Sequence, residues 1–76
     1  MSSVLPSYTS KKLIRFFKKQ GWREDRQRGS HLSLVNPDGS KTITIPVHSG
    51  TDIGKGLFKR ILNDAEISVE EFNRLR

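Results

Sequence analysis

The sequence predicts a small α+β domain in which a three-stranded antiparallel sheet carries two helices on one face. Three observations predict this class. Apolar residues recur at helical spacing towards both ends of the chain, whereas they alternate with polar residues in its middle. Two turn sequences, Arg28-Gly29-Ser30 and Pro37-Asp38-Gly39, divide the middle into three short segments. The resulting order is α-β-β-β-α with a short C-terminal helix, which is typical of an α+β sandwich.

Length and composition narrow the classes of function. We predict a flexible lead-in over residues 1–8 and one small domain over residues 9–76. The net charge of +6 makes polyanions the natural partners. Without cysteine, the chain has no disulfide, thiolate zinc site or cysteine nucleophile. The absence of cysteine fits a reducing cytoplasm, where we expect the protein. No apolar run approaches the roughly 20 residues that span a bilayer, so we expect no membrane contact.

The first helix is predicted to begin at a Thr9 or Ser10 cap and to end near Gln20, where Gly21 stops it. Its apolar side chains fill one side and are expected in the core. Its cations fall within a sector of about 120° on the opposite side. They are Lys11, Lys12, Arg15, Lys18 and Lys19. This basic face is either a phosphate-binding surface or a solvated helix face.

The first predicted strand, residues 22–27, is a weak candidate for an edge strand, because Trp22 is its only apolar residue. We expect Trp22 to pack against the first helix, and the alternative is stacking on a nucleotide base.

The alternation of apolar and polar residues predicts the register of the next two strands. If Leu32 lies opposite Ile45 and Leu34 lies opposite Ile43, both apolar pairs face the core. This register leaves a four-residue loop over residues 37–40, which is a common hairpin length.

The same register puts a histidine on the open face of the sheet. His31 then lies opposite Pro46 and points away from the core. His48, at the end of a third strand predicted over residues 42–48, would lie diagonally from His31. Diagonal neighbours are roughly 7–8 Å apart, so two imidazoles would flank one phosphate. The alternative for His48 is a loop residue that caps the strand.

The second helix is predicted over about residues 54–64. Gly54 and Gly56 leave backbone N–H groups of its first turn uncovered beside Lys55, which suits an anion; the alternative is close packing of the helix on the sheet. Residues 68–71 form a capping box that begins a short helix ending at Leu75. The buried stripe of the second helix is expected to contain Leu57, Phe58, Ile61, Leu62 and Ala65.

The acidic residues are too scattered to suggest a metal site, and we expect no cofactor. General acid–base catalysis by imidazole remains, since imidazole titrates near neutral pH. RNA supplies its own nucleophile, the 2′-hydroxyl beside the phosphate. A histidine surrounded by cations is therefore a sufficient minimal ribonuclease.

Residues 10–72 resemble the HicA family, small mRNA interferase toxins of type II toxin–antitoxin pairs. The resemblance rests on the order and spacing of five motifs: Lys19-Gln20-Gly21-Trp22, Arg26-Gln27-Arg28-Gly29-Ser30-His31, Pro37-Asp38-Gly39, Ile45-Pro46-Val47-His48, and Lys55-Gly56-Leu57-Phe58-Lys59-Arg60-Ile61-Leu62. Two features depart from the family: Leu32 stands where many members have a second histidine, and the first seven residues have no counterpart.

The resemblance implies a fold like that of a double-stranded RNA-binding domain, with His31 of the Gly-Ser-His motif as the catalyst. It also implies metal-independent endoribonuclease activity on mRNA, growth arrest and neutralisation by a HicB-type antitoxin.

We predict His31 and His48 as catalytic residues. The predicted RNA-binding residues are Lys11, Lys12, Arg15, Lys18, Lys19, Arg28, Gly29, Ser30 and Lys55. The alternatives are a non-catalytic double-stranded-RNA-binding module using Lys55, Lys59 and Arg60, and an inactive regulatory homologue.

Overall fold

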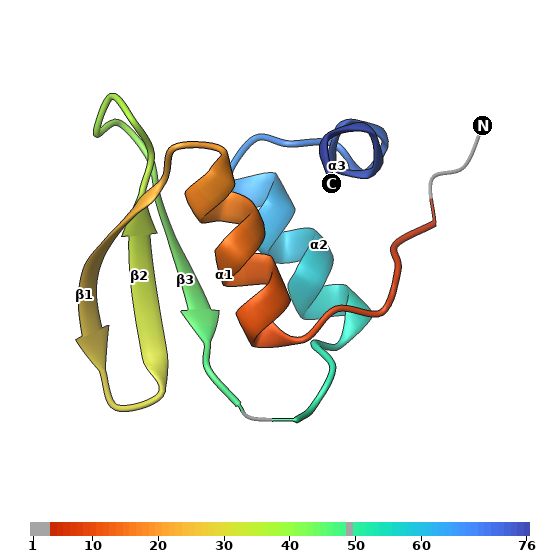
Figure 1. The fold of residues 1–76 in the computed structure, drawn as a ribbon, viewed down its shortest axis with the longest axis horizontal. Coiled ribbons are helices and arrows are strands. Elements are labelled where there is room, and N and C mark those ends of the chain that lie inside the picture. Colours follow the sequence, from red (N-terminus) through yellow and green to blue (C-terminus); the bar gives the residue numbers. More distant parts are fainter. Residues whose placement is uncertain (1–3, 49) are drawn as a thin grey trace.

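A computed structural model describes residues 4–48 and 50–76 and has the predicted α+β architecture (Figure 1). The first three residues of the predicted lead-in, and Ser49 in the loop after His48, lie outside the described residues. An antiparallel sheet has the strand order β1-β2-β3. The elements are α1 (Ser10–Lys19), β1 (Arg23–Arg28), β2 (His31–Val35), β3 (Thr42–Pro46), α2 (Lys55–Asp64) and α3 (Val69–Leu75).

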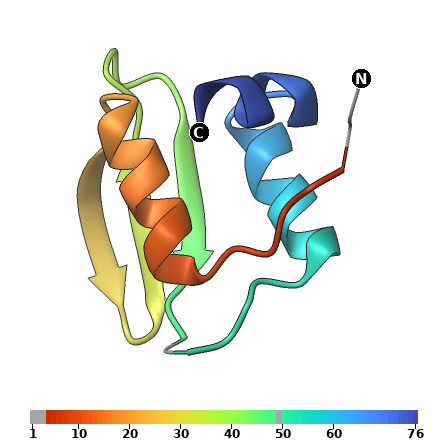
Figure 2. The ribbon, with the colours of Figure 1, turned by 45° about the vertical axis from the view of Figure 1, so that its right-hand side comes forward.

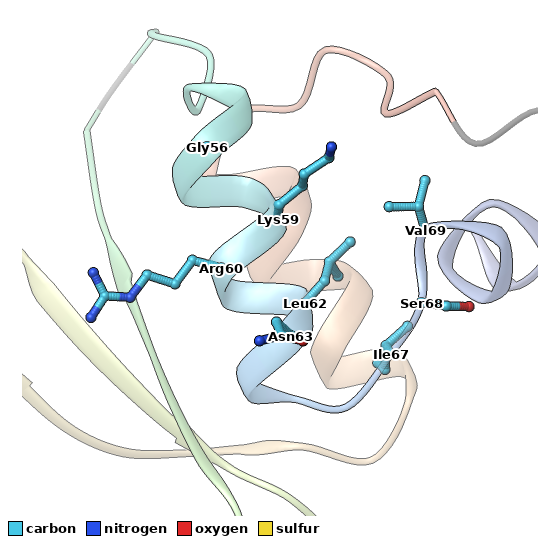
Figure 3. Close-up of a pocket in the computed structure, with 8 residues that line it drawn as sticks. All are labelled: Gly56, Lys59, Arg60, Leu62, Asn63, Ile67, Ser68 and Val69. Atoms are coloured by element: carbon cyan, nitrogen blue, oxygen red, sulfur yellow. The ribbon is translucent and has the colours of Figure 1, made fainter.

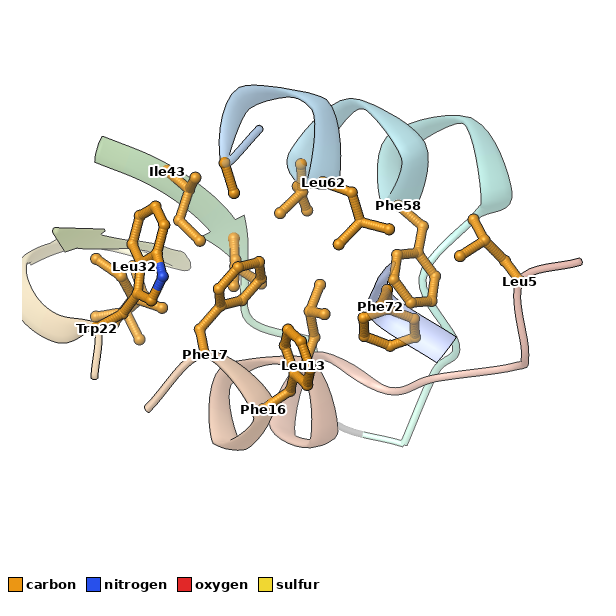
Figure 4. Close-up of a cluster of buried hydrophobic side chains, with 14 residues drawn as sticks. Leu5, Leu13, Phe16, Phe17, Trp22, Leu32, Ile43, Phe58, Leu62 and Phe72 are labelled. Carbon is orange, nitrogen blue, oxygen red and sulfur yellow. The ribbon is translucent and has the colours of Figure 1, made fainter. Parts of the chain in front are cut away.

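The helices form one layer and the sheet forms the other (Figures 1 and 2). Both α1 and α2 pack near β3, and α3 packs against α2. The space between the layers holds the apolar core, to which every described helix contributes (Figure 4). Trp22 belongs to this core, as predicted: it is 7% exposed, and its ring centroid lies 5.2 Å from that of Phe17. The described helices all lie on this side of the sheet, which leaves its opposite face open.

The helix ends follow the capping residues in the sequence. The Thr9 hydroxyl accepts a hydrogen bond from the Lys12 N–H at the start of α1. Gly21 follows this helix with φ +94°, a conformation that favours glycine. At α3 the Ser68 hydroxyl accepts a hydrogen bond from the Glu71 N–H. The predicted bounds of the helices are therefore confirmed to within a residue or two.

The predicted register of β2 and β3 is confirmed: Leu32 pairs with Ile45, Leu34 pairs with Ile43, and His31 pairs with Pro46. The third strand, however, ends at Pro46 and not at residue 48 as predicted. The Ser10 hydroxyl donates a 2.6 Å hydrogen bond to the Pro46 carbonyl. This bond joins the end of β3 to the start of α1. One further backbone hydrogen bond, from the Val47 N–H to the Ser30 carbonyl, precedes the turn of the chain towards α2.

Strand β1 contains a bulge that the sequence analysis did not predict. Glu24 pairs with Leu34 and Arg26 pairs with Ser33, so Asp25 has no partner on β2. An extra residue shifts the alternation of side chains by one position. Glu24 therefore lies on the helical side, where it forms an ion pair with Lys18, whereas Arg26 lies on the open face.

Two further features of the helical layer differ from expectation or extend it. Leu57, predicted to be buried, is 39% exposed, because it lies at the edge of the α2 stripe beside β3. In the lead-in, Leu5 is buried and its carbonyl accepts a 2.8 Å hydrogen bond from the Lys55 ammonium. The division of the chain at residue 8 stays a prediction.

Candidate active site

His31 is the first residue of β2 and follows a two-residue turn of Gly29 and Ser30. Gly29 has φ +55° at the first position of the turn, a position that glycine commonly takes in tight hairpins. Because the next residue, Leu32, is buried in the core, alternation directs His31 to the open face, where it is exposed. Arg28 lies opposite it on β1, and Pro46 lies opposite it on β3.

Two hollows meet at His31. The smaller, of about 250 Å³, is lined by Arg26, Arg28, His31, Ser33 and Thr44. The larger, of about 440 Å³, lies between β3 and α2 and is lined by His31, Thr42, Thr44, Pro46, Leu57, Arg60, Ile61 and Asp64. His31 and Thr44 line both hollows. They therefore stand at the boundary between a hollow flanked by β1 and a groove flanked by α2.

Cationic side chains flank both hollows. Among residues 4–48 and 50–76, the three ion pairs within 4 Å involve Lys18, Lys41 and Arg74. Arg26, Arg28 and Arg60 are exposed and form none of these pairs. Their guanidinium groups are therefore available to bind phosphate oxygens, for which the planar fork of arginine is well suited. The Ser33 and Thr44 hydroxyls, which line the smaller hollow beside Arg26 and Arg28, lie 3.4 Å apart.

His48 lines a third and smaller hollow, of about 120 Å³. Its backbone N–H lies 3.5 Å from the Ser10 hydroxyl, so the residue sits beside the start of α1. This hollow shares Pro46 and Leu57 with the groove that His31 lines. His48 is thus a neighbour of the candidate site, and its pairing with His31 stays a prediction.

The predicted basic face of α1 belongs to the helical layer, whereas His31 lies on the open face of the sheet. Lys12, Arg15 and Lys19 surround a hollow of about 340 Å³ together with Arg76, and the Lys12 ammonium lies 5.8 Å from the centroid of the Tyr8 ring. The structure therefore does not bring these cations into the hollows around His31.

Of the remaining predicted RNA-binding residues, Arg28 lines the smaller hollow, and Gly29 and Ser30 form the turn beside it. Lys55 is the first residue of α2, and its ammonium binds the lead-in. Gly54 caps that helix without a side-chain hydrogen bond.

Two arginines near His31 were absent from the predicted site. Arg26 was missed because β1 has almost no apolar residues that show which side chains face the helices. The bulge also interrupts the alternation, so that Glu24 and Arg26 face opposite sides of the sheet. Arg60 lies three residues after Leu57 on α2, which places both on one stripe of the helix. The spacing of Leu57 and Arg60 was the one sign in the sequence that they share a face. It is the packing of α2 beside β3 that brings this face next to His31.

A hollow of about 510 Å³ lies between α2 and α3 and does not include His31 (Figure 3). Lys59 and Asn63 line it together with the apolar side chains of Leu62, Ile67 and Val69. Among the described residues, no three His, Asp or Glu side chains gather closely enough to hold a metal ion.

Comparison with known proteins gives one family. Residues 10–67 match the family described as HicA toxin of bacterial toxin–antitoxin. No curated protein matches the chain. In the part of the chain that the structure describes, no helix has the length and apolar content needed to cross a membrane.

Proposed function

The chain belongs to the HicA toxin family of bacterial toxin–antitoxin systems, and from this membership we propose that it is a metal-independent endoribonuclease that cleaves mRNA. Its neutralising partner is an antitoxin, which we propose to be of the HicB type. The observation that carries the proposal is the position of His31: an exposed imidazole at the boundary of two hollows, flanked by arginines without ion pairs to any described residue.

In the proposed reaction, His31 takes the proton from the 2′-hydroxyl of the RNA. The 2′-oxygen attacks the adjacent phosphorus, and the bond from phosphorus to the 5′-oxygen breaks. The products are a 2′,3′-cyclic phosphate and a 5′-hydroxyl, which receives its proton from an acid at the site or from water. His48 is the proposed candidate for that acid.

Negative charge builds on the phosphate oxygens in the transition state. Two arginines line the same hollow as the imidazole: Arg28, which lies opposite His31, and Arg26. Charged donors positioned where charge develops usually give the largest stabilisation of a transition state. We assign this role to the two arginines. Lys11, Lys12, Arg15, Lys18 and Lys19 are proposed to hold parts of the RNA away from the scissile bond.

Substitution of His31 tests this function. His31→Ala is expected to lower the rate of RNA cleavage by about 10²–10⁴-fold and to abolish growth arrest. The fold should persist, because the exposed imidazole contributes little packing. His48→Ala serves as the comparison and is expected to lose less activity. A purified His31→Ala protein that is folded and cuts RNA at the wild-type rate would show that the assigned catalyst is wrong.

A non-catalytic double-stranded-RNA-binding module is the second candidate. The observation in its favour is the cluster of Lys12, Arg15 and Lys19 in the helical layer, away from His31. Such modules recognise duplex RNA by its shape and phosphates. A binder would retain labelled duplex and leave it intact, whereas the proposed toxin shortens single-stranded RNA.

A further inference from the structure

The groove between β3 and α2 has the composition of a nucleotide-binding site. It runs beside the edge strand of the sheet, with His31 and Pro46 at one end and Thr42 and Asp64 at the other. This order follows because β3 and α2 run in opposite directions past each other (Figure 1). Its volume of about 440 Å³ lies within the range of small-ligand sites.

We infer that this groove binds the nucleotide next to the scissile phosphate, with the Arg60 guanidinium on the flanking phosphate. The inference rests on the proposed function and extends it, because it gives the RNA a path. A single strand would cross the open face of the sheet from Arg28, over His31, to Arg60. The strand thus crosses β1, β2 and β3 rather than following α1.

The direction of the Arg60 side chain supports this path. Figure 3 shows Arg60 extending away from α3 and towards β3, whereas the neighbouring Lys59 extends on the other side of α2. Arg60 is exposed and has no ion pair with any described residue. A cation without a protein partner at the edge of the groove is suited to a ligand phosphate.

The apolar end of the groove offers a surface for a base. Leu57 is 39% exposed there, beside Pro46, although the helical periodicity predicted it to be buried. Bases that leave their stack are commonly held between aromatic or apolar side chains. Leu57 thus offers an apolar side chain beside His31 on which a base can pack. An unstacked base requires a single strand, so the groove selects single-stranded RNA.

The opposite end of the groove repels phosphate. Asp64 lies one turn after Arg60 and lines the groove beside Thr42. Its carboxylate would repel a backbone that continued along β3 in that direction. The flanking phosphate is therefore confined to the section between His31 and Arg60, which agrees with a path across the strands.

The test compares two neighbouring cations on α2. Wild type, Arg60→Ala, Arg60→Lys and Lys59→Ala are assayed for cleavage of one labelled single-stranded RNA under identical salt conditions. Arg60→Ala is expected to lower kcat/KM by about 10- to 100-fold, the effect of removing one charge-assisted hydrogen bond. Lysine should restore part of this activity, since it supplies the charge without the fork. Lys59→Ala removes the same charge on the other side of the helix and should stay within about twofold of wild type.

A binding measurement separates this inference from the proposed function. A 2′-O-methyl oligonucleotide, which lacks the nucleophile, is titrated into ¹⁵N-labelled protein. Amide shifts at Thr44, Leu57 and Arg60 are expected, and these shifts support the groove even if the protein cuts no RNA. If wild type cuts RNA while Arg60→Ala matches it, or loses no more activity than Lys59→Ala, the groove is not the binding site. Absence of shifts in the groove would likewise overturn the inference.

Discussion

Arg28 lies directly opposite His31 in the ladder between β1 and β2. Directly opposed residues on one face of an antiparallel pair have Cβ atoms about 4.5–5.5 Å apart. The guanidinium and the imidazole can therefore contact the same phosphate. The two-residue turn produces this pairing, because Gly29 and Ser30 are the only residues between the two.

The first prediction concerns Arg28. Arg28→Ala is expected to reduce the cleavage rate by about 10- to 100-fold, because the transition state loses a charged donor. Arg23→Ala is the matched control: Arg23 pairs with Val35 on the same face, roughly 13 Å farther along the sheet at about 3.3 Å per residue. Single-turnover kinetics on one RNA compares the two variants. Equal reductions of the cleavage rate in both variants would show that the effect comes from the loss of positive charge in general and not from the position of Arg28 beside His31.

The bulge at Asp25 gives a second prediction. Deleting Asp25 removes the unpaired residue and leaves Arg26 opposite Ser33, so cleavage should be retained. Deleting Gln27 also removes the bulge, but it places Asp25 opposite Ser33 and turns Arg26 to the helical side. This second variant should lose most of its activity. The measurement is a cleavage assay on both proteins, with circular dichroism to verify folding. Similar activities of the two variants would contradict the assignment of Arg26 to the open face.

The basic face of α1 gives a third prediction. Arg15→Glu should weaken RNA binding and make its dependence on salt shallower, by about 0.7 in the logarithmic slope for each phosphate that the protein no longer binds. The rate of cleavage of bound RNA should stay unchanged, since Arg15 lies in the helical layer, away from His31. Lys59→Glu provides a control with the same kind of charge reversal. Unchanged affinity and slope in Arg15→Glu would identify this face as merely solvated.

A fourth prediction concerns the chemistry of the products. If the 2′-hydroxyl is the nucleophile, the upstream fragment ends in a 2′,3′-cyclic phosphate, and activity survives chelation by EDTA. Mass spectrometry of the fragments identifies the ends. A 3′-hydroxyl end, or complete inhibition by EDTA, would indicate attack by water with a metal ion instead.

The antitoxin provides the fifth prediction. A partner that neutralises the toxin is expected to present an acidic surface and to cover His31, because charge complementarity steers association. A stable complex of this kind buries roughly 1,200–2,000 Å² in total. Hydrogen exchange of the complex should show protection at the turn of Gly29 and Ser30. Full exposure of this turn in a neutralised complex would require a mechanism other than occlusion.

Residue patterns in the sequence are sufficient to predict the order of helices and strands and the register of β2 and β3. Leu32, Leu34, Ile43 and Ile45 alternate with polar residues, and only one pairing buries all four on the same side. The position of His31 on the open face follows from that pairing. Local capping signals at Thr9 and in the segment 68–71 likewise determined where helices begin.

Which cations share a face with His31 depends, in contrast, on how distant segments pack together. The side chains of β1 are too polar to show which of them face the helices, so the bulge at Asp25, which puts Glu24 and Arg26 on opposite faces, had no signal in the sequence. The placement of α2 beside β3 depends on packing between distant segments, and it brings Leu57 and Arg60 to the groove that His31 lines. The same packing puts the basic face of α1 in the other layer. The periodicity of apolar residues predicts which face of a helix or strand is buried. Which other element lies beside each face depends on how the helical layer packs on the sheet.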